Sequence, residues 1–174
     1  MSDQQHPEPL SASSLVALFG KIAFREHPHR HGMVIPSTPW VSANIRRIFV
    51  PALHHVQPGG LINVHHKIIR QTERAWRDVV AADLMGLVLT WDGSYVPRHK
   101  GWDPKRSLSS HAWGIAFDIN ARWNGYGATP AAWKDHGTVR PLVAIFERHG
   151  FAWGGWWTKR YKDGMHFECY KVIP

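Results

Sequence analysis

Two histidines and an aspartate stand in short motifs that could bind a metal ion. His111 and Asp118 belong to the segment Ser109–Asp118, and His166 follows further along the chain in Asp163–Glu168. Three protein ligands with an open fourth position are the arrangement of a catalytic zinc ion, whereas structural zinc sites fill that position. Because the chain has 13 histidines in 174 residues, spacing alone is weak evidence. The residues around these motifs carry the argument.

The two motifs sit on segments that are expected to form strands. Over 114–120, small or polar residues alternate with large apolar ones, which predicts a half-buried strand. Residues 165–172 alternate in the same way. If the two strands pair, Asp118 and His166 come within the distance at which both could bind one ion. A turn at the start of the first strand would fold His111 back toward them.

Three patterns together resemble a known family. The pattern S-x-H-x-x-G-x-A-x-D at Ser109–Asp118 is followed by W-G-G-x-W at Trp153–Trp157 and D-x-x-H-F at Asp163–Phe167. This combination is similar to the zinc D-alanyl-D-alanine carboxypeptidases and L-alanyl-D-glutamate endopeptidases. These enzymes include vancomycin-resistance carboxypeptidases and phage endolysins, and they cleave the peptides of peptidoglycan. The resemblance covers roughly residues 86–170.

The resemblance implies a role for each matching residue. His111, Asp118 and His166 would be the zinc ligands, and Asp163 would be the general base. Many relatives carry S-G-Y-R-S upstream, with an Arg that faces the scissile carbonyl. Here the segment reads G-S-Y-V-P-R, so Arg98 is the candidate, two residues later than in those relatives.

Further candidates surround the proposed centre. Glu168 shares the ligand side of its strand and could accept a hydrogen bond from a ligand histidine; surface exposure is the alternative. Ser109 could hydrogen-bond to substrate or to its own loop. Trp113 and Trp156 could contact substrate with large rigid rings, and core packing is the alternative for each.

The pattern of elements predicts an α+β fold, a small mainly antiparallel sheet with flanking helices. The family resemblance implies the arrangement of hedgehog and DD-peptidase domains. Residues 1–9 are expected to be a disordered tail and 10–174 a single zinc peptidase domain, with 10–60 as a candidate N-terminal extension. Expected helices are 10–21, 61–84 and 138–150, expected strands are 44–51, 87–91, 114–120 and 165–172, and 27–39 is an expected loop.

Composition bounds the class of protein. A hydrophobic content of 44% and a charged content of 20% are ordinary for a globular domain. The one cysteine excludes an intrachain disulfide, and its alternation with apolar neighbours makes Cys169 an expected buried thiol. The clustered histidines at 27–31 and 65–66 are expected to be solvent or packing groups, because nothing around them suggests convergence on a metal.

The net charge of +8 predicts attraction to polyanions, such as the anionic polymers of a bacterial cell wall. No recognition-helix or aromatic RNA-binding motif is visible, which argues against nucleic acid. The polar N-terminus lacks a signal-peptide pattern, and no apolar run could span a membrane. We therefore expect synthesis in the cytoplasm, action at the cell wall, and stem peptides of peptidoglycan as partners. A non-catalytic, zinc-containing wall-binding module is the alternative, and the presence of Asp163 argues against it.

Overall fold

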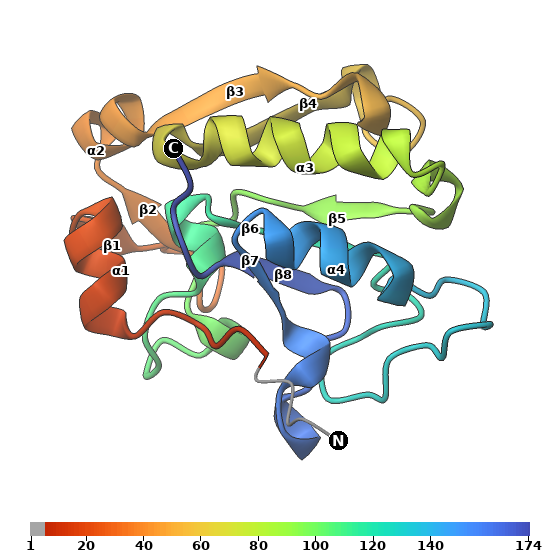
Figure 1. Ribbon diagram of the computed structural model, residues 1–174. Coiled ribbons are helices and arrows are strands. Elements are labelled where there is room, and N and C mark those ends of the chain that lie inside the picture. Colours follow the sequence, from red (N-terminus) through yellow and green to blue (C-terminus); the bar gives the residue numbers. More distant parts are fainter. Residues whose placement is uncertain (1–5) are drawn as a thin grey trace.

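The computed structural model describes residues 6–174, so part of the predicted tail, residues 1–5, lies outside it. Its centre is an antiparallel sheet of four strands in the order β5-β6-β8-β7 (Figure 1). These strands are β5 (Trp91–Gly93), β6 (Ala116–Ile119), β7 (Phe151–Trp153) and β8 (His166–Cys169).

Two short antiparallel ribbons and four α-helices complete the structure. The ribbons are β1 (Phe24–Glu26) with β2 (Val34–Pro36), and β3 (Ile45–Phe49) with β4 (Leu61–His65). The helices are α1 (Ala12–Phe19), α2 (Thr38–Asn44), α3 (Ile69–Ala81) and α4 (Arg140–Arg148). The predicted α+β class is confirmed. Among the described residues, no helix combines the length and the apolar character needed to cross a membrane.

The main core lies between the four-stranded sheet and the helices α3 and α4. Trp76 of α3 and Phe146 of α4 have ring centroids 5.1 Å apart, and Phe146 lies 4.8 Å from Phe167 of β8. Phe167 stacks on Phe117 of β6 at 5.3 Å. Because side chains alternate along a strand, the neighbours of these phenylalanines point to the opposite face of the sheet.

The register of β6 and β8 sets which residues face each other. Phe117 is opposite Phe167, and Asp118 is opposite His166. The predicted alternation and pairing are therefore confirmed. The expectation of a half-buried strand is wrong, since every residue of β6 is buried. Strands on both of its edges and covered faces on both sides account for this.

Two expected elements have different boundaries. The predicted helix 61–84 is a helix only over α3, and its first part is strand β4, which pairs with β3 from Phe49↔Leu61 to Ile45↔His65. The predicted central strand 87–91 is also wrong. A 3-10 turn ends at Leu87, and the strand β5 that follows lies at the edge of the sheet.

The segment before residue 60 is more ordered than expected. Within the predicted loop 27–39, strand β2 pairs with β1, and α2 begins at Thr38.

The strand β7, for which no strand was expected, pairs with β8. The β3–β4 ribbon reaches the motif region directly, because the His65 N–H donates to the Gly114 carbonyl at 2.8 Å. Cys169 is buried, as predicted.

Candidate metal centre

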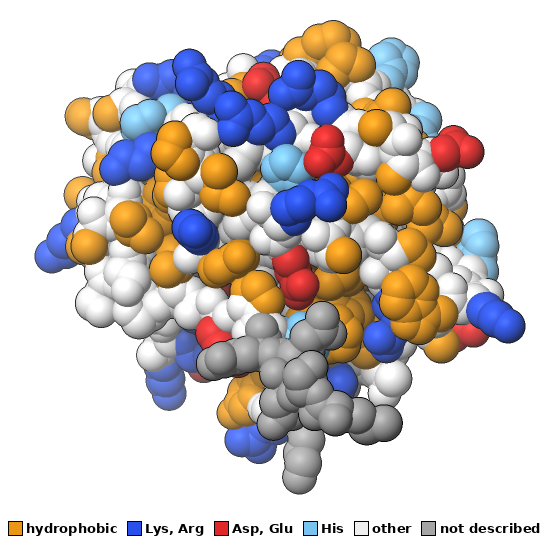
Figure 2. Space-filling model, in the orientation of Figure 1, with side chains coloured by type: hydrophobic (Ala, Val, Ile, Leu, Met, Phe, Trp, Pro, Cys, Tyr) orange, Lys and Arg blue, Asp and Glu red, His pale blue; other side chains and the backbone are white. Residues whose placement is uncertain are grey.

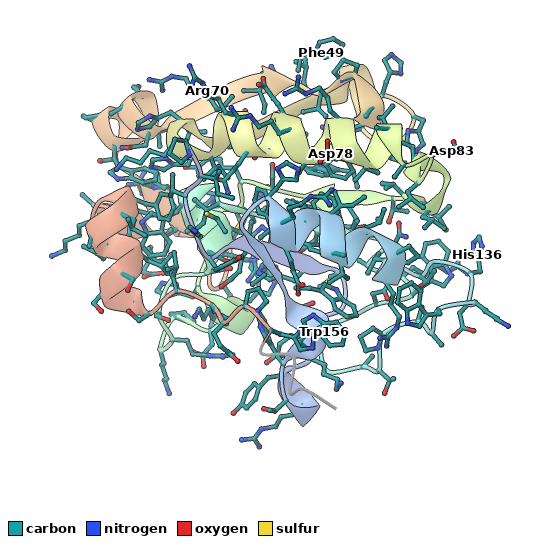
Figure 3. All side chains as sticks on the ribbon, in the orientation of Figure 1. Phe49, Arg70, Asp78, Asp83, His136 and Trp156 are labelled. Atoms are coloured by element: carbon teal, nitrogen blue, oxygen red, sulfur yellow. The ribbon has the colours of Figure 1, made fainter. Side chains whose placement is uncertain are left out.

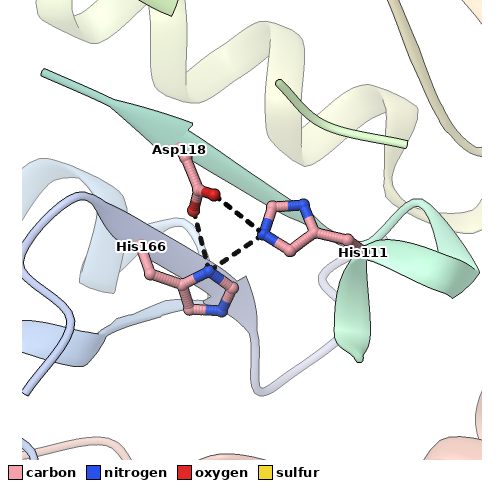
Figure 4. A group of neighbouring side chains, drawn as sticks. All are labelled: His111, Asp118 and His166. Carbon is pink, nitrogen blue, oxygen red and sulfur yellow. Dashed lines mark hydrogen bonds and ion pairs between the residues drawn. The ribbon is translucent and has the colours of Figure 1, made fainter. Parts of the chain in front are cut away.

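The three predicted ligands converge on one point (Figure 4). The Nδ1 atom of His166 lies 2.9 Å from Asp118 Oδ1 and 3.1 Å from His111 Nε2. His111 Nε2 lies 3.2 Å from the other carboxylate oxygen, Asp118 Oδ2. All three residues are buried. Asp118 and His166 come from paired positions on β6 and β8, whereas His111 comes from a 3-10 turn at Ser110–Trp113.

Gly114 turns His111 back toward the strand that follows, as predicted. Its φ of 68° is left-handed, and the N–H of Gly114 donates to the carbonyl of His111. A Cβ on Gly114 would lie 2.9 Å from Ile45 Cδ1 and 3.1 Å from the His65 N atom. Glycine is therefore required here both by backbone conformation and by the close approach of the β3–β4 ribbon.

Hydrogen bonds orient both histidine rings. The Nδ1–H of His111 donates to the Ser94 carbonyl at 2.8 Å, which leaves Nε2 with a free lone pair. The Nε2–H of His166 donates to Glu168 Oε2 at 2.9 Å, so Nδ1 is the nitrogen that faces Asp118 and His111. Ser94 is itself held by β4, because its hydroxyl donates to the Asn63 carbonyl at 2.8 Å.

The atoms that face one another are thus His111 Nε2, His166 Nδ1 and the Asp118 carboxylate, and without a metal ion His166 Nδ1–H donates to Asp118 Oδ1 at 2.9 Å. These atoms lie 2.9–3.2 Å apart, so once His166 gives up its Nδ1 proton all of them can act as acceptors toward one cation. The electrostatics show that the centre stabilises positive charge, which a proton supplies when no metal ion is bound. Burial would lower the pKa of His166, but hydrogen bonds to Asp118 and Glu168 raise it to about 10. Burial would raise the pKa of Asp118, but the two histidines depress it strongly. The donor set therefore fits a metal ion.

Asp163 lies beside the three ligands with an unsatisfied oxygen. Its Oδ1 is buried and has no hydrogen-bond partner within the described part of the chain. Burial raises the pKa of Asp163 to about 6, and the charges of Asp118 and Glu168 also raise it, against lowering by His166 and Arg98. The turn that carries Asp163 is closed by the His166 N–H, which donates to the Asp163 carbonyl at 3.2 Å.

Gly154 allows the backbone of Asp163 to approach closely. The Asp163 N–H donates to the Gly154 carbonyl at 3.0 Å, and a Cβ on Gly154 would lie 2.5 Å from the Asp163 carbonyl oxygen.

We expect Gly154→Ala to push the Asp163 turn away, destabilising the fold by about 1–3 kcal/mol. If Asp163 acts in catalysis, turnover should fall at least about tenfold. Chemical denaturation and steady-state kinetics would check this, with Gly86→Ala, whose Cβ meets nothing within 4 Å, as the control.

Arg98 extends from a segment that the N-terminal ribbon holds in place. Arg98 forms a bridge with Met33, and the His99 N–H donates to the Gly32 carbonyl at 2.8 Å. The His99 ring also contacts Glu26 of β1 at 2.9 Å. Burial lowers the pKa of the Arg98 guanidinium, while two carboxylates of the centre raise it. Its charge therefore acts on the centre, and the candidate extension 10–60 supports it.

The other candidates are placed differently. Ser109 is buried, and its Oγ accepts from the His111 N–H at 3.4 Å, so it caps the turn that carries the ligand. Trp113 is 6% exposed, and its Nε1–H donates to the Gly20 carbonyl, which supports the core-packing alternative. Trp156 donates to Glu147 of α4 and stacks on His6, so its contacts lie on the α4 side (Figure 3).

Trp157 belongs to the W-G-G-x-W pattern and was a candidate wall of the site, whereas the roles of Ser110 and Ser94 near the centre were not expected from the sequence. Trp157 packs against His166 with ring centroids 5.5 Å apart, and Ser110 Oγ lies 3.4 Å from His166 Nε2. Ser94 supplies the carbonyl that orients His111. Strand alternation gives no signal for any of them, because all three lie outside the two paired strands.

A family model described as D-alanyl-D-alanine carboxypeptidase matches residues 102–169. The matched segment contains the three candidate ligands and Asp163, but not Arg98. The match confirms the predicted resemblance to the zinc carboxypeptidase and endopeptidase family, and it supports a peptidase. The searches of curated proteins and of solved structures gave no match.

Proposed function

We propose that the chain is a zinc-dependent peptidase that hydrolyses peptide bonds in bacterial peptidoglycan. One observation carries the proposal: two imidazole nitrogens and a carboxylate converge on one point, beside a buried carboxylate oxygen that has no partner among the described residues. The family match over residues 102–169 supports the reaction class. The substrate class follows from the description of that family.

His111 Nε2, an Asp118 oxygen and His166 Nδ1 would hold the ion. Two imidazoles and one carboxylate are a ligand set that zinc accepts, and three protein ligands leave a position open. When bound there, zinc would polarise a carbonyl group and lower the pKa of a water molecule toward neutrality. Glu168 and the Ser94 carbonyl would keep both rings oriented for binding.

Asp163 would act as the general base. A carboxylate with a pKa of about 6 is ionised at neutral pH and is more basic than an exposed one. It would accept a proton from the attacking water and then return that proton to the leaving amine. The positive charge of Arg98 would stabilise the negative charge that develops on the carbonyl oxygen.

The alternative is a wall-binding module that holds zinc without catalysis. Such a module has no need of an unpaired, buried carboxylate next to the metal ligands, and leaving one unsatisfied costs stability. The partnerless Oδ1 of Asp163 therefore favours the peptidase.

Product analysis tests the proposal. We expect the zinc-loaded protein to cleave peptide bonds of intact peptidoglycan and to leave the glycan strands intact, because glycosidases need paired carboxylates around the sugar bond. We favour the endopeptidase, since the +8 charge would hold the protein on an anionic wall. Mass spectrometry would identify the new termini. Release of free D-alanine alone would indicate the carboxypeptidase instead, and no cleavage by a fully metal-loaded protein would favour the binding module.

Arg98→Ala separates a role in turnover from a role in binding. We expect kcat to fall about 10²–10³-fold with a much smaller change in KM, because the guanidinium would act mainly on charge that develops during the reaction. Arg122→Ala, an exposed arginine on another loop, is the control. A change confined to KM would reassign Arg98 to ground-state substrate binding.

A further inference from the structure

A groove lies on the molecule away from the metal centre. It has a volume of about 420 Å³ and runs between α3 and the segment that follows β3. Its lining residues are Phe49, Val50, Pro51, Ala52, Glu73, Trp76, Arg77 and Val80. We call it the α3 groove. Trp76, which lines it, packs on Phe117, whereas Asp118 and His166 point to the opposite face of the sheet.

The walls of the α3 groove are apolar and unusually exposed. Phe49 is 57% exposed and Val80 is 51% exposed, although both are large hydrophobic residues that are normally covered. Trp76 is nearly fully buried beneath them. A volume of about 420 Å³ falls in the range of pockets that hold small organic ligands. An apolar part of a ligand would therefore gain free energy by leaving water here.

The rim of the α3 groove is basic. Arg77 lines it directly, and Arg70, seven residues earlier, lies on the same side of the helix. Arg47 is two residues before Phe49, so it shares the outward side of β3. None of these three arginines forms a salt bridge among the described residues, and all are exposed. In the orientation of Figure 1, α3 and β3 lie at the top of the molecule. Figure 2 shows Lys and Arg side chains gathered along this top edge, and Figure 3 places Phe49 and Arg70 there.

One acidic residue, Glu73, lies near these three arginines, so the rim keeps a net positive charge. Glu73 lines the groove but makes no ion pair within the described part of the chain. Asp78, on another side of α3, is occupied by Arg148 and His149 at 3.2 and 2.8 Å. The unpaired arginines would repel a second copy of this basic chain, and they favour a ligand with negative charge.

We propose that the α3 groove binds an anionic amphiphile, an acyl chain that ends in a phosphate or carboxylate, as in anionic lipids. The chain would lie on Phe49 and Val80, over the buried Trp76. The head would lie at the rim, where Arg77 presents paired N–H donors that match phosphate or carboxylate oxygens. This binding is separate from the proposed peptidase reaction and does not depend on it.

Calorimetry with three probes tests the apolar walls and the basic rim of the α3 groove separately. Decyl phosphate has chain and charge, decyl maltoside has the chain alone, and inorganic phosphate has the charge alone. We expect the full-length protein to bind decyl phosphate most tightly and inorganic phosphate not measurably. Co-sedimentation with phosphatidylglycerol vesicles, compared with phosphatidylcholine vesicles, then distinguishes a lipid surface from a single free amphiphile.

Exposed residues allow variants that keep the fold, which circular dichroism would verify. Phe49→Ser and Val80→Ser should each weaken the affinity for decyl phosphate about tenfold, which is the effect of removing about two buried methylene groups. Arg77→Glu should weaken the affinity for decyl phosphate by a similar factor and leave the affinity for decyl maltoside unchanged. Trp133→Ser and Lys134→Glu, matched changes at exposed positions of another loop, should alter neither. Peptide hydrolysis should be unaffected by all five substitutions.

Two results would overturn the proposal. Equal affinity of the wild-type protein for decyl phosphate and inorganic phosphate would mean that the apolar walls contribute nothing. Binding of a DNA duplex that is lost with Arg77→Glu but retained with Phe49→Ser and Val80→Ser, without binding of decyl phosphate, would identify a polyanion surface instead.

Discussion

Asp163→Asn should abolish most peptide hydrolysis while leaving metal content and stability unchanged. The amide has the same shape as the carboxylate but cannot accept a proton, and general acid–base catalysis is commonly worth about 10²–10⁴-fold. The fold should tolerate the change, because the buried Oδ1 of Asp163 has no hydrogen bond to lose in the described structure. Kinetics on peptidoglycan peptides, metal analysis and thermal unfolding would be measured on one preparation.

The matched control is Asp135→Asn, which makes the same substitution at an exposed loop position. It should leave turnover within a factor of about two, as is usual for surface changes. Near-normal turnover in Asp163→Asn with full metal would show that another group is the base. Glu168, which already accepts from His166 at 2.9 Å, would then be tested.

His166→Ala should remove most of the bound metal, and with it the activity. Only His111 and Asp118 would remain as ligands, and a pair of protein ligands lacks the coordination that zinc sites in proteins use. We expect metal affinity to fall by more than the 10–100-fold that is typical when a residue behind a ligand is changed. Elemental analysis after dialysis would measure this directly.

Two controls calibrate this loss. Glu168→Gln should weaken metal affinity about 10–100-fold, because it alters only the group that orients the His166 ring. His149→Ala removes a histidine that pairs with Asp78 on the helical side, and it should have no effect on metal. Full zinc in His166→Ala would contradict the ligand assignment even if activity were lost.

The pairing at the centre of the site was predictable because it is encoded locally. Alternation along two short segments was enough to place Asp118 and His166 on one side and Phe117 and Phe167 on the other. The turn at Gly114 was predictable for a similar reason, since it follows from a glycine beside a ligand motif.

Other features depend on partners that are distant in the sequence. Residues 61–65 fit a helical pattern and an alternating one equally well, and pairing with β3 decides the outcome. Trp113 enters the core because the Gly20 carbonyl, from the end of α1, accepts its N–H. The position of Arg98 is set by Met33, in a segment that sequence patterns suggested was a loop. Side-chain types alone do not reveal such long-range contacts.

The ribbon that contacts the Arg98 segment has a practical consequence for protein engineering. The segment that the family model matches, residues 102–169, contains every candidate ligand. It omits Arg98 and the ribbon that holds the Arg98 segment in place. A shortened chain or chimera that starts after Phe49 would keep the ligands and lose Gly32, Met33 and the backbone partners that they offer to residues 98 and 99. A transplantable unit therefore has to start before Phe24, the first residue of that ribbon.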